Sequence, residues 1–282
     1  MTARDHAPLR SRSSSQSSSS VAGYAHRLTR RDFEILIELY EHRVLTTPQI
    51  YELHFDTHTR ASKRMLQLYR LGLVERFRPH TPTGSAPWHY TLDEPGARLV
   101  AARQEIDYDK FRFKKARIFD VVGSPRLRHR VECNGFFARL ALACRRRGWR
   151  LEWTGERRAT ASWDSVISPD GIGHIEAGDR EISFFLEYDR GTENHDQLGN
   201  KTCRYRLVGR TARSEDALLF VFPSAARERY ARSALVGASV PISTAVRADT
   251  LRRPLGPVWL PLHDDCRRPI LELLRVSRDE PG

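Results

Sequence analysis

Apolar residues at helical spacing mark the first patterned segment of the chain. Phe33, Leu36, Ile37 and Tyr40 follow the i, i+3, i+4, i+7 pattern of one helix face, and Thr29 stands before them as an N-cap. Such a pattern is typical of an amphipathic helix that packs one face against a core. We therefore predict a helix after Thr29 that buries these four residues.

Two more helices are predicted downstream. Thr47 followed by Pro48 suits an N-cap and the first position of a second helix. A third helix is predicted to open at Thr57 or Thr59. The predicted buried residues are Ile50, Tyr51 and Leu53 in the second helix and Met65, Leu68 and Tyr69 in the third.

A hairpin is predicted after the third helix, which should end near Leu71-Gly72, where glycine can adopt a left-handed cap. Leu73–Arg78 and Trp88–Leu92 have the composition of two strands, and the loop between them is rich in Pro, Gly and Ser. A short helix is expected at Gly96–Gln104. Three helices followed by a hairpin are typical of a winged helix-turn-helix.

The element order after residue 113 predicts a second domain. The expected elements are a helix (Arg126–Arg147), strands (Trp149–Thr154, Gly171–Glu176 and Glu181–Asp189), a helix (Glu193–Val208) and a strand (Ala217–Phe222), followed by a helix (Ala225–Leu235) and a strand (Pro241–Val246). The order α-β-β-β-α-β predicts the fold class α+β. The expected divisions are a serine-rich disordered tail (1–26), a winged-helix DNA-binding domain (27–113), this second domain (114–262) and a C-terminal tail (263–282).

Composition excludes several protein classes. Hydrophobic residues make up 40% and charged residues 29% of the 282 positions, which excludes a fully disordered or collagen-like chain. No window approaches the roughly 18–20 apolar residues of a membrane span, and no apolar segment follows the first arginines as in a secretory signal. The four cysteines form no C-x-x-C pair, which indicates reduced thiols and a cytoplasmic protein.

The net charge of +12 favours a polyanionic partner. Residues 112–158 alone carry 14 Lys and Arg against 4 Asp and Glu, so most of the surplus lies in 47 residues. Arginine-rich composition explains the choice of arginine over lysine, but it does not explain this clustering. We therefore expect double-stranded DNA as the partner.

Basic residues of the first domain are candidates for DNA contact. On the third helix they form a stripe opposite the apolar residues, a pattern that suits the major groove. The same stripe is also typical of a solvated face or of a winged helix that docks on a protein. The candidates are Arg60, Lys63, Arg64, Gln67 and Arg70 on the helix, Arg76 and Arg78 on the wing, and Arg126, Arg128 and Arg130 in the basic stretch.

Three carboxylates are candidates for a metal site. Asp170 stands at the entrance of the predicted hairpin, and Glu187 and Asp189 close its second strand. Residues i and i+2 of a strand point to the same side, and pairing would bring Asp170 to the same end. Convergent carboxylates hold divalent cations, so Mg²⁺ or Mn²⁺ is expected here, where it could activate water against a phosphodiester.

The layout of Pro-Asp before a hairpin and Glu-x-acid at its far end resembles the PD-(D/E)XK nuclease superfamily. More narrowly, residues 29–260 are similar to the replication-relaxation family of actinobacterial plasmids and chromosomes. The motifs are the N-terminal winged helix, a Trp-rich strand, PDG at 169–171, LEYDRGTE at 186–193 and Leu198…Lys201…Tyr205. The resemblance implies a role in plasmid replication and in DNA relaxation or mobilisation.

The chain departs from the superfamily at one position, because Asp189 stands where the resemblance implies a lysine. In one interpretation Lys201, on the next helix, supplies the cation that orients water, with Asp170, Glu187 and Asp189 as ligands. Glu132 in the first helix of the domain is a further catalytic candidate. In the other interpretation the site is degenerate and the fold serves as a platform for DNA.

These interpretations lead to three hypotheses for a nucleoid- or plasmid-associated protein. The first is a DNA-processing protein that nicks or cleaves with Mg²⁺. The second is a non-enzymatic DNA-binding accessory or regulator. The third is an adaptor for a partner ATPase of replication or conjugation, since no G-x-x-x-x-G-K-[ST] loop is present. Paired half-sites would favour a homodimer, although no long heptad run supports one.

Overall fold

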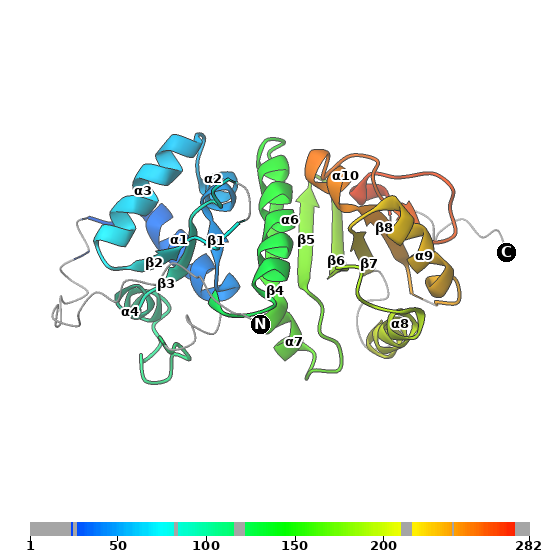
Figure 1. The fold of residues 1–282 in the computed structure, drawn as a ribbon, viewed down its shortest axis with the longest axis horizontal. Helices are drawn as coiled ribbons and strands as arrows, with labels where there is room; N and C mark the ends of the chain where they lie inside the picture. Colours follow the sequence, from blue (N-terminus) through cyan, green and yellow to red (C-terminus); the bar gives the residue numbers. More distant parts are fainter. Residues whose placement is uncertain are drawn as a thin grey trace. The chain divides into compact units, whose positions relative to one another are not determined.

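The computed structural model describes residues 24, 27–81, 84–115, 122–209, 216–238 and 240–273. The chain is of mixed α and β structure, as predicted, and divides into two compact units, residues 1–131 and 132–282 (Figure 1). The predicted serine-rich tail falls outside the described residues except for Tyr24. Residues 263–273, predicted as part of a C-terminal tail, carry Ile270 and Leu273 into the core of the second unit.

In its described residues the first unit combines helices α1 to α4 with a small antiparallel sheet in the order β1-β3-β2. Its helices are α1 (Arg30–His42), α2 (Thr47–His54), α3 (His58–Arg70) and α4 (Glu94–Arg103). Its strands are β1 (Leu45–Thr46), β2 (Val74–Phe77) and β3 (His89–Leu92). The predicted hairpin is present as β2 and β3, and β1 is a strand that the sequence pattern did not predict.

Side-chain caps determine where these helices begin. Thr46, one residue before the predicted cap, accepts a hydrogen bond from the Gln49 N–H, and the Gln49 side chain accepts one from the Thr46 N–H at 2.9 Å. This capping box satisfies two backbone donors that helix geometry leaves unpaired. The Thr57 side chain caps α3 by accepting a hydrogen bond from the Arg60 N–H, and Gly72, with φ of +75°, follows the end of the helix in the left-handed region.

The buried face of α1 differs from the predicted one. Leu36 is buried as expected, but Phe33, Ile37 and Tyr40 are only half-buried. Apolar residues between 33 and 40 cover more than one face, so their spacing fits two orientations, and packing selects the other one. The buried residues are Asp32, Ile35, Leu36, Leu39 and His42 in α1, Thr47, Gln49, Ile50 and Glu52 in α2, and Ala61, Met65 and Leu68 in α3; Tyr51, Leu53 and Tyr69 are half-buried.

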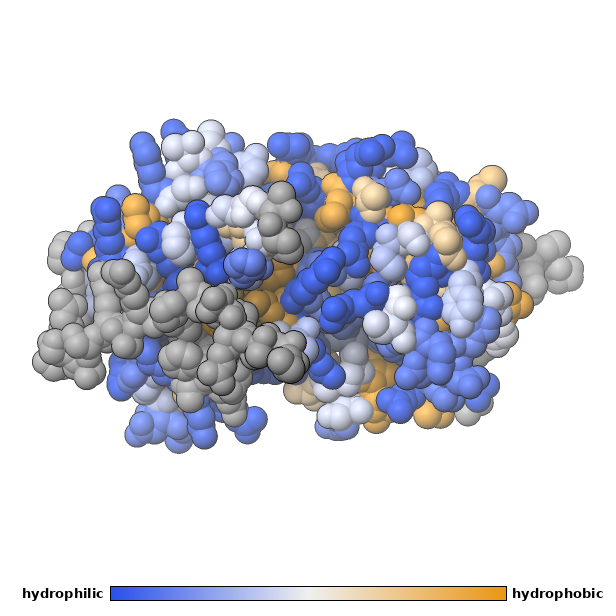
Figure 2. Space-filling view, viewed as in Figure 1, coloured by the Kyte–Doolittle hydropathy of each residue, from blue (hydrophilic) through white to orange (hydrophobic). Residues whose placement is uncertain are grey.

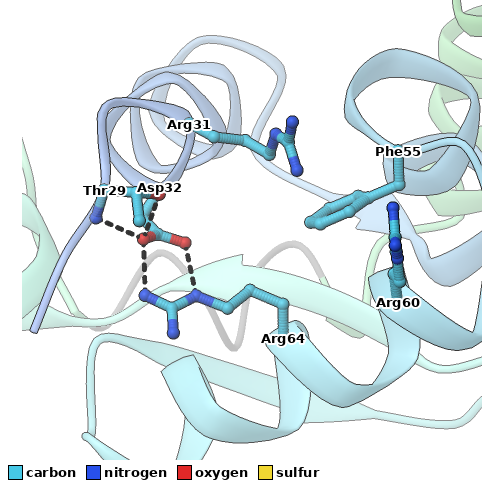
Figure 3. Close-up of a pocket in the computed structure, with 6 residues that line it drawn as sticks. All are labelled: Thr29, Arg31, Asp32, Phe55, Arg60 and Arg64. Carbon is cyan, nitrogen blue, oxygen red and sulfur yellow. Dashed lines mark hydrogen bonds and ion pairs between the residues drawn. The ribbon is translucent and has the colours of Figure 1, made fainter.

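A buried ion pair joins α1 to α3. Asp32 is fully buried, and its two carboxylate oxygens accept hydrogen bonds from Arg64 Nε at 2.7 Å and Nη2 at 2.5 Å (Figure 3). The Thr29 N–H also donates to Asp32, at 2.6 Å. Burial by itself would raise the pKa of Asp32, but the hydrogen bonds from Arg64 and Thr29 outweigh it and hold the pKa below 3.8. Asp32 therefore stays charged inside the unit.

The second unit is built on a six-stranded sheet in the order β4-β5-β6-β7-β8-β9, in which β6, β7 and β8 are parallel and the other neighbours antiparallel (Figure 1). Its strands are β4 (Arg150–Gly155), β5 (Gly171–Ala177), β6 (Arg180–Tyr188), β7 (Ala217–Phe222), β8 (Ile242–Val246) and β9 (Leu260–Pro261). Its helical elements are α6 (Leu127–Arg145, which contains the boundary between the units), α7 (Glu156–Ser162), α8 (His195–Gly209), α9 (Ala225–Leu235), α10 (Arg247–Arg252) and a 3-10 turn, η2 (Ile270–Glu272). The elements α7, α10, β9 and η2 were not predicted.

Both faces of this sheet are covered. Alternate residues of β7 point to opposite sides: Leu219 and Val221 pack with α6, whereas Phe220 and Phe222 pack with α8 and α9. A strand that is apolar on both faces is typical of the parallel centre of a sheet between two helical layers. Gly173 in β5 leaves room for an aromatic ring, because an added Cβ there would lie 2.2 Å from Phe184. The sheet is therefore the central layer of the unit.

Hydrophilic residues cover most of the visible surface of the described residues (Figure 2). The large exposed apolar side chains are scattered and include Ile106, Leu207 and Val236. Across the described ranges, no helix combines the length and the apolar character that a membrane crossing would require.

We predict that Asp32→Asn lowers the free energy of unfolding of the first unit by about 3–5 kcal/mol, because it strands the buried Arg64 guanidinium. Since the folded pKa of Asp32 lies below 3.8, the wild-type advantage is complete above that pH and is lost as the pH falls through the folded pKa. Urea denaturation at several pH values measures both effects. Glu34→Gln, which removes the exposed partner of Arg30, is the control and should change stability by less than about 0.5 kcal/mol.

Candidate functional site

The hairpin of β5 and β6 places Asp170 beside the end of β6. Gly171 lies opposite Leu186 in the antiparallel register, and the Asp170 N–H donates to the Leu186 carbonyl at 3.0 Å. The Asp170 carboxylate accepts a hydrogen bond from the Tyr188 N–H at 2.7 Å. Asp170 is thus fixed at the strand end that carries Glu187.

Glu187 is buried on the side of the sheet that α8 covers. Its neighbours Leu186 and Tyr188 pack on the α6 side, so the alternation of the strand turns Glu187 the other way. Glu187 Oε2 accepts a hydrogen bond from Lys201 Nζ at 2.9 Å, and Oε1 accepts one from the Tyr205 hydroxyl at 2.5 Å. Lys201 and Tyr205 lie one turn apart on α8, so one helix face supplies both partners.

Lys201 lies between two carboxylates. Its Nζ also donates to Glu193 Oε1 at 2.7 Å. Burial alone would lower the pKa of Lys201, but Glu187 and Glu193 raise it above its ordinary value. Lys201 is therefore a fixed ammonium group at this site and not a general base. Sequence reasoning missed Glu193, although it ends the motif at 186–193 that carried the family resemblance.

The pKa of Glu187 is raised to about 7, because burial and the charge of Asp170 raise it more than Lys201 and Tyr205 lower it. Burial and the neighbouring Glu187 also raise the pKa of Tyr205 well above its ordinary value. The Tyr205 phenol therefore stays protonated and acts as a hydrogen-bond donor to Glu187. This environment argues against a tyrosine nucleophile.

Asp189 has a separate partner, Arg227 of α9. Arg227 Nε donates to Asp189 Oδ2 at 2.6 Å, and its Nη2 donates to the Glu193 carbonyl at 2.5 Å. Among the described residues, Asp170, Glu187 and Asp189 do not bring their oxygens within 4.8 Å of one another, so the expected convergence of all three is wrong. The reason is that β6 ends at Tyr188 and Arg227 holds the next residue.

Glu132 also has a basic partner. Arg247 of α10 donates to its Oε1 at 3.0 Å. The following residue on α6, Cys133, places its Sγ within 4.8 Å of an Asp170 oxygen. Burial raises the pKa of Cys133 well above its ordinary value, so the thiol stays neutral. Cys133 of α6 therefore lies next to Asp170, whereas Glu132 forms an ion pair with Arg247.

The donor set suits a hard divalent cation. Four acids, Asp170, Glu187, Asp189 and Glu193, lie around the bases Lys201 and Arg227. Within the described part of the chain, Asp189 Oδ1 and Glu193 Oε2 are buried without a hydrogen-bond partner. Unpaired buried carboxylate oxygens are costly, and Mg²⁺ and Mn²⁺ prefer oxygen ligands. The residues present therefore fit such an ion.

The predicted DNA-contacting residues of the first unit fall into two groups. Lys63, Gln67 and Arg70 are exposed on α3, as is Arg60, whereas Arg64 is held by Asp32. The wing arginines stack on aromatic rings. Arg76 lies 4.4 Å from the Tyr69 ring centre and 4.1 Å from that of Trp88, and Arg78 lies 4.2 Å from Trp88. At the start of α6, Arg126 and Arg128 are exposed and Arg130 is half-buried.

We predict that Lys201→Met lowers the free energy of unfolding of the second unit by about 3–5 kcal/mol, because it leaves Glu187 buried without its counter-charge. Glu187→Gln in the same chain should restore most of the loss, which gives a large coupling energy in a double-mutant cycle measured by urea denaturation. Arg98→Met, which breaks an exposed pair with Glu94, is the control. Equal losses in the Lys201 and Arg98 variants would contradict the buried ion pair.

Comparison with known proteins places these features in a family. A family model described as replication-relaxation matches residues 36–220, which is well over half of the chain. The match covers most of the first unit and the part of the second that holds Asp170, Glu187, Lys201 and Tyr205. No curated protein matches the chain. On the extent of the family match, the chain belongs to the replication-relaxation family.

Proposed function

We propose that the chain is a DNA-binding protein with a replication-related role whose second unit hydrolyses phosphodiester bonds with Mg²⁺ or Mn²⁺. The observation that carries the proposal is the buried Glu187 carboxylate, held by Lys201 and Tyr205 beside Asp170. Burying a carboxylate among titratable groups is costly and is typical of functional sites. Membership of the replication-relaxation family supports the replication-related role. We propose more specifically that this role is plasmid relaxation or mobilisation.

The element order supports a nuclease-like interpretation of the second unit. The sequence α6-β4-β5-β6-α8-β7 contains the expected α-β-β-β-α-β core once the short α7 is set aside. Asp170 lies just before β5, Glu187 lies on β6, and Lys201 and Tyr205 lie on α8. In the first unit, three helices followed by the β2–β3 hairpin support a winged helix. These arrangements make DNA the substrate that we propose.

In the proposed reaction each side chain of the site has its own role. The acids at this strand end, Asp170 and Glu187 with the unpaired oxygens of Asp189 and Glu193, would hold the cation, which when bound would stabilise phosphate charge and activate water. The Lys201 ammonium would offset the negative charge that develops on the phosphate, and Tyr205 fixes Glu187 by a hydrogen bond. Arg227 holds Asp189 and the Glu193 backbone in place. Water adds to phosphorus, one P–O bond breaks, and the leaving oxygen takes a proton.

One observation favours a second candidate function, a non-enzymatic DNA-binding accessory or regulator. Both Glu187 oxygens are hydrogen-bonded and Asp189 is paired with Arg227, as in a structural ion-pair network. In this alternative the second unit clamps DNA or docks on a partner ATPase without cleaving. A cleavage assay separates the two candidates.

We predict that the full chain converts supercoiled plasmid to open or linear DNA in Mg²⁺ or Mn²⁺. Asp170→Ala combined with Glu187→Ala should lower the rate by roughly 100-fold or more, because charge stabilisation at the reacting phosphate is lost. Gel electrophoresis of a time course measures the rate.

The matched control for this assay is Glu176→Gln combined with Glu181→Gln. These acids lie on the same hairpin with side chains 43% and 67% exposed, so the control should cleave like wild type. Wild-type binding of duplex without any cleavage would move the conclusion to the accessory candidate.

We further predict that the exposed α3 face binds DNA phosphates. The slope of log affinity against log salt is negative, and each lost phosphate contact reduces its magnitude by roughly 0.9, so Lys63→Ala combined with Arg70→Ala should reduce the magnitude by roughly 1.8. Fluorescence anisotropy with duplex DNA at several salt concentrations measures the slope. Arg98→Ala combined with Arg103→Ala removes two exposed charges from α4 and should leave it unchanged. Equal slopes for wild type and both double variants would show that the exposed α3 face does not bind DNA phosphates.

A further inference from the structure

A pocket of about 310 Å³ opens in the first unit, where α1 and α3 begin (Figure 3). The pocket is remote in sequence from the acidic residues of the second unit. Figure 3 shows the Phe55 ring projecting between the side chains of Arg31 and Arg60, with the Asp32–Arg64 pair along the opposite wall. Its lining residues are Thr29, Arg31, Asp32, Phe55, Arg60 and Arg64.

The pocket carries a positive charge that its own acid does not cancel. Asp32 and Arg64 neutralise each other through two hydrogen bonds, so Arg31 and Arg60 add two further charges. Arg60 has an acidic neighbour in Asp56, but they lie 3.7 Å apart with side chains 71% and 82% exposed. Exposed pairs of this kind are weak, so Arg60 can turn to a better anion.

The backbone strengthens this preference for an anion. The pocket lies at the N-terminal turns of two helices, with Thr29, Arg31 and Asp32 from α1 and Arg60 from α3. Helix N-termini carry partial positive charge and favour phosphate groups. The Asp32 carboxylate already caps the end of α1, so the end of α3 and the positive side chains are what act together on an anion.

The remaining wall is apolar and aromatic. Phe55 lines the pocket with a small part of its surface, since the residue is only 5% exposed, and the Arg31 guanidinium lies 5.0 Å from the ring centre. Aromatic rings and arginine planes are surfaces on which nucleic-acid bases stack. The volume is near the lower end of the roughly 300–1,000 Å³ of ligand pockets, which suits one nucleotide and not a longer strand.

We propose that this pocket binds a single nucleotide, with its phosphate on Arg31 and Arg60 and its base against Phe55. The nucleotide comes either from solution or from DNA, as an unpaired residue turned out of the helix. If the nucleotide comes from DNA, the inference rests on the DNA-binding function proposed above. A nucleotide from solution would make the first unit responsive to a small molecule independently of cleavage.

Isothermal titration calorimetry of the full chain tests the pocket with dCMP, deoxycytidine and inorganic phosphate as probes. We expect dCMP to bind more tightly than either fragment, because only dCMP offers both the phosphate and the base. Arg31→Ala and Arg60→Ala should each weaken dCMP at least ~10-fold, since charge-assisted hydrogen bonds to phosphate are lost. Arg30→Ala is the matched control, because the Arg30 side chain is 91% exposed and should leave the affinity unchanged.

A second arm distinguishes the two sources of the nucleotide. Duplex DNA with one unpaired nucleotide is compared with the same duplex fully paired, by fluorescence anisotropy. Tighter binding of the unpaired duplex that disappears in Arg31→Ala, together with no dCMP binding, assigns the pocket to DNA. The fully paired duplex reports the proposed DNA-binding function separately, so failure of that function and failure of the pocket are distinguishable.

The proposal is overturned if two results occur together. In the first, dCMP binds no more tightly than deoxycytidine or inorganic phosphate. In the second, the duplex with one unpaired nucleotide binds no more tightly than the fully paired duplex. It is also overturned if Arg30→Ala weakens binding as much as Arg31→Ala and Arg60→Ala do. Thermal melting of each variant checks that the fold is intact. Phe55→Leu, which keeps an apolar side chain, should weaken dCMP and leave inorganic phosphate unchanged.

Discussion

The buried carboxylate of Glu187 is the constraint on which the second unit depends. A charge inside a protein is tolerated only with partners that replace water, and here those partners come from one face of α8. The position of α8 on the sheet is therefore tied to Lys201 and Tyr205. Asp170 adds a second carboxylate at the same strand end, which raises the pKa of Glu187 further. The result is a site that gathers acidic groups around the Lys201 ammonium.

Two buried oxygens connect this structure to the proposed function. A purely structural network would pair its buried oxygens, whereas this one leaves those of Asp189 and Glu193 without a hydrogen-bond partner within the described residues. A divalent cation would be a partner for them, and a phosphodiester next to it would meet the Lys201 ammonium. The same groups thus explain both the cost of the site to stability and the chemistry proposed for it.

A buried ion pair also stabilises the first unit, where it joins two helices. Asp32 is buried and neutralised by Arg64, which removes one arginine from the basic face of α3 and ties α1 to α3. The charges left at this junction belong to Arg31 and Arg60, around Phe55. The stripe of basic residues on α3 therefore separates into one structural arginine, Arg64, and others that remain exposed.

The sequence by itself determined the order and type of most elements, because caps, turn residues and apolar periodicity are local signals. Strand β7 and helix α9 have the predicted bounds, and α8, β5 and β6 differ by a few residues. Local patterns also identified Asp170 and Glu187, the family resemblance pointed to Lys201, and the fold brings the three together. Tertiary structure decided the buried face of α1, where spacing fits two orientations. It also decided the partner of Asp189, because Arg227 lies 38 residues further along the chain, on helix α9. Pairing across such a distance depends on how the helices pack on the sheet, and no local pattern encodes it.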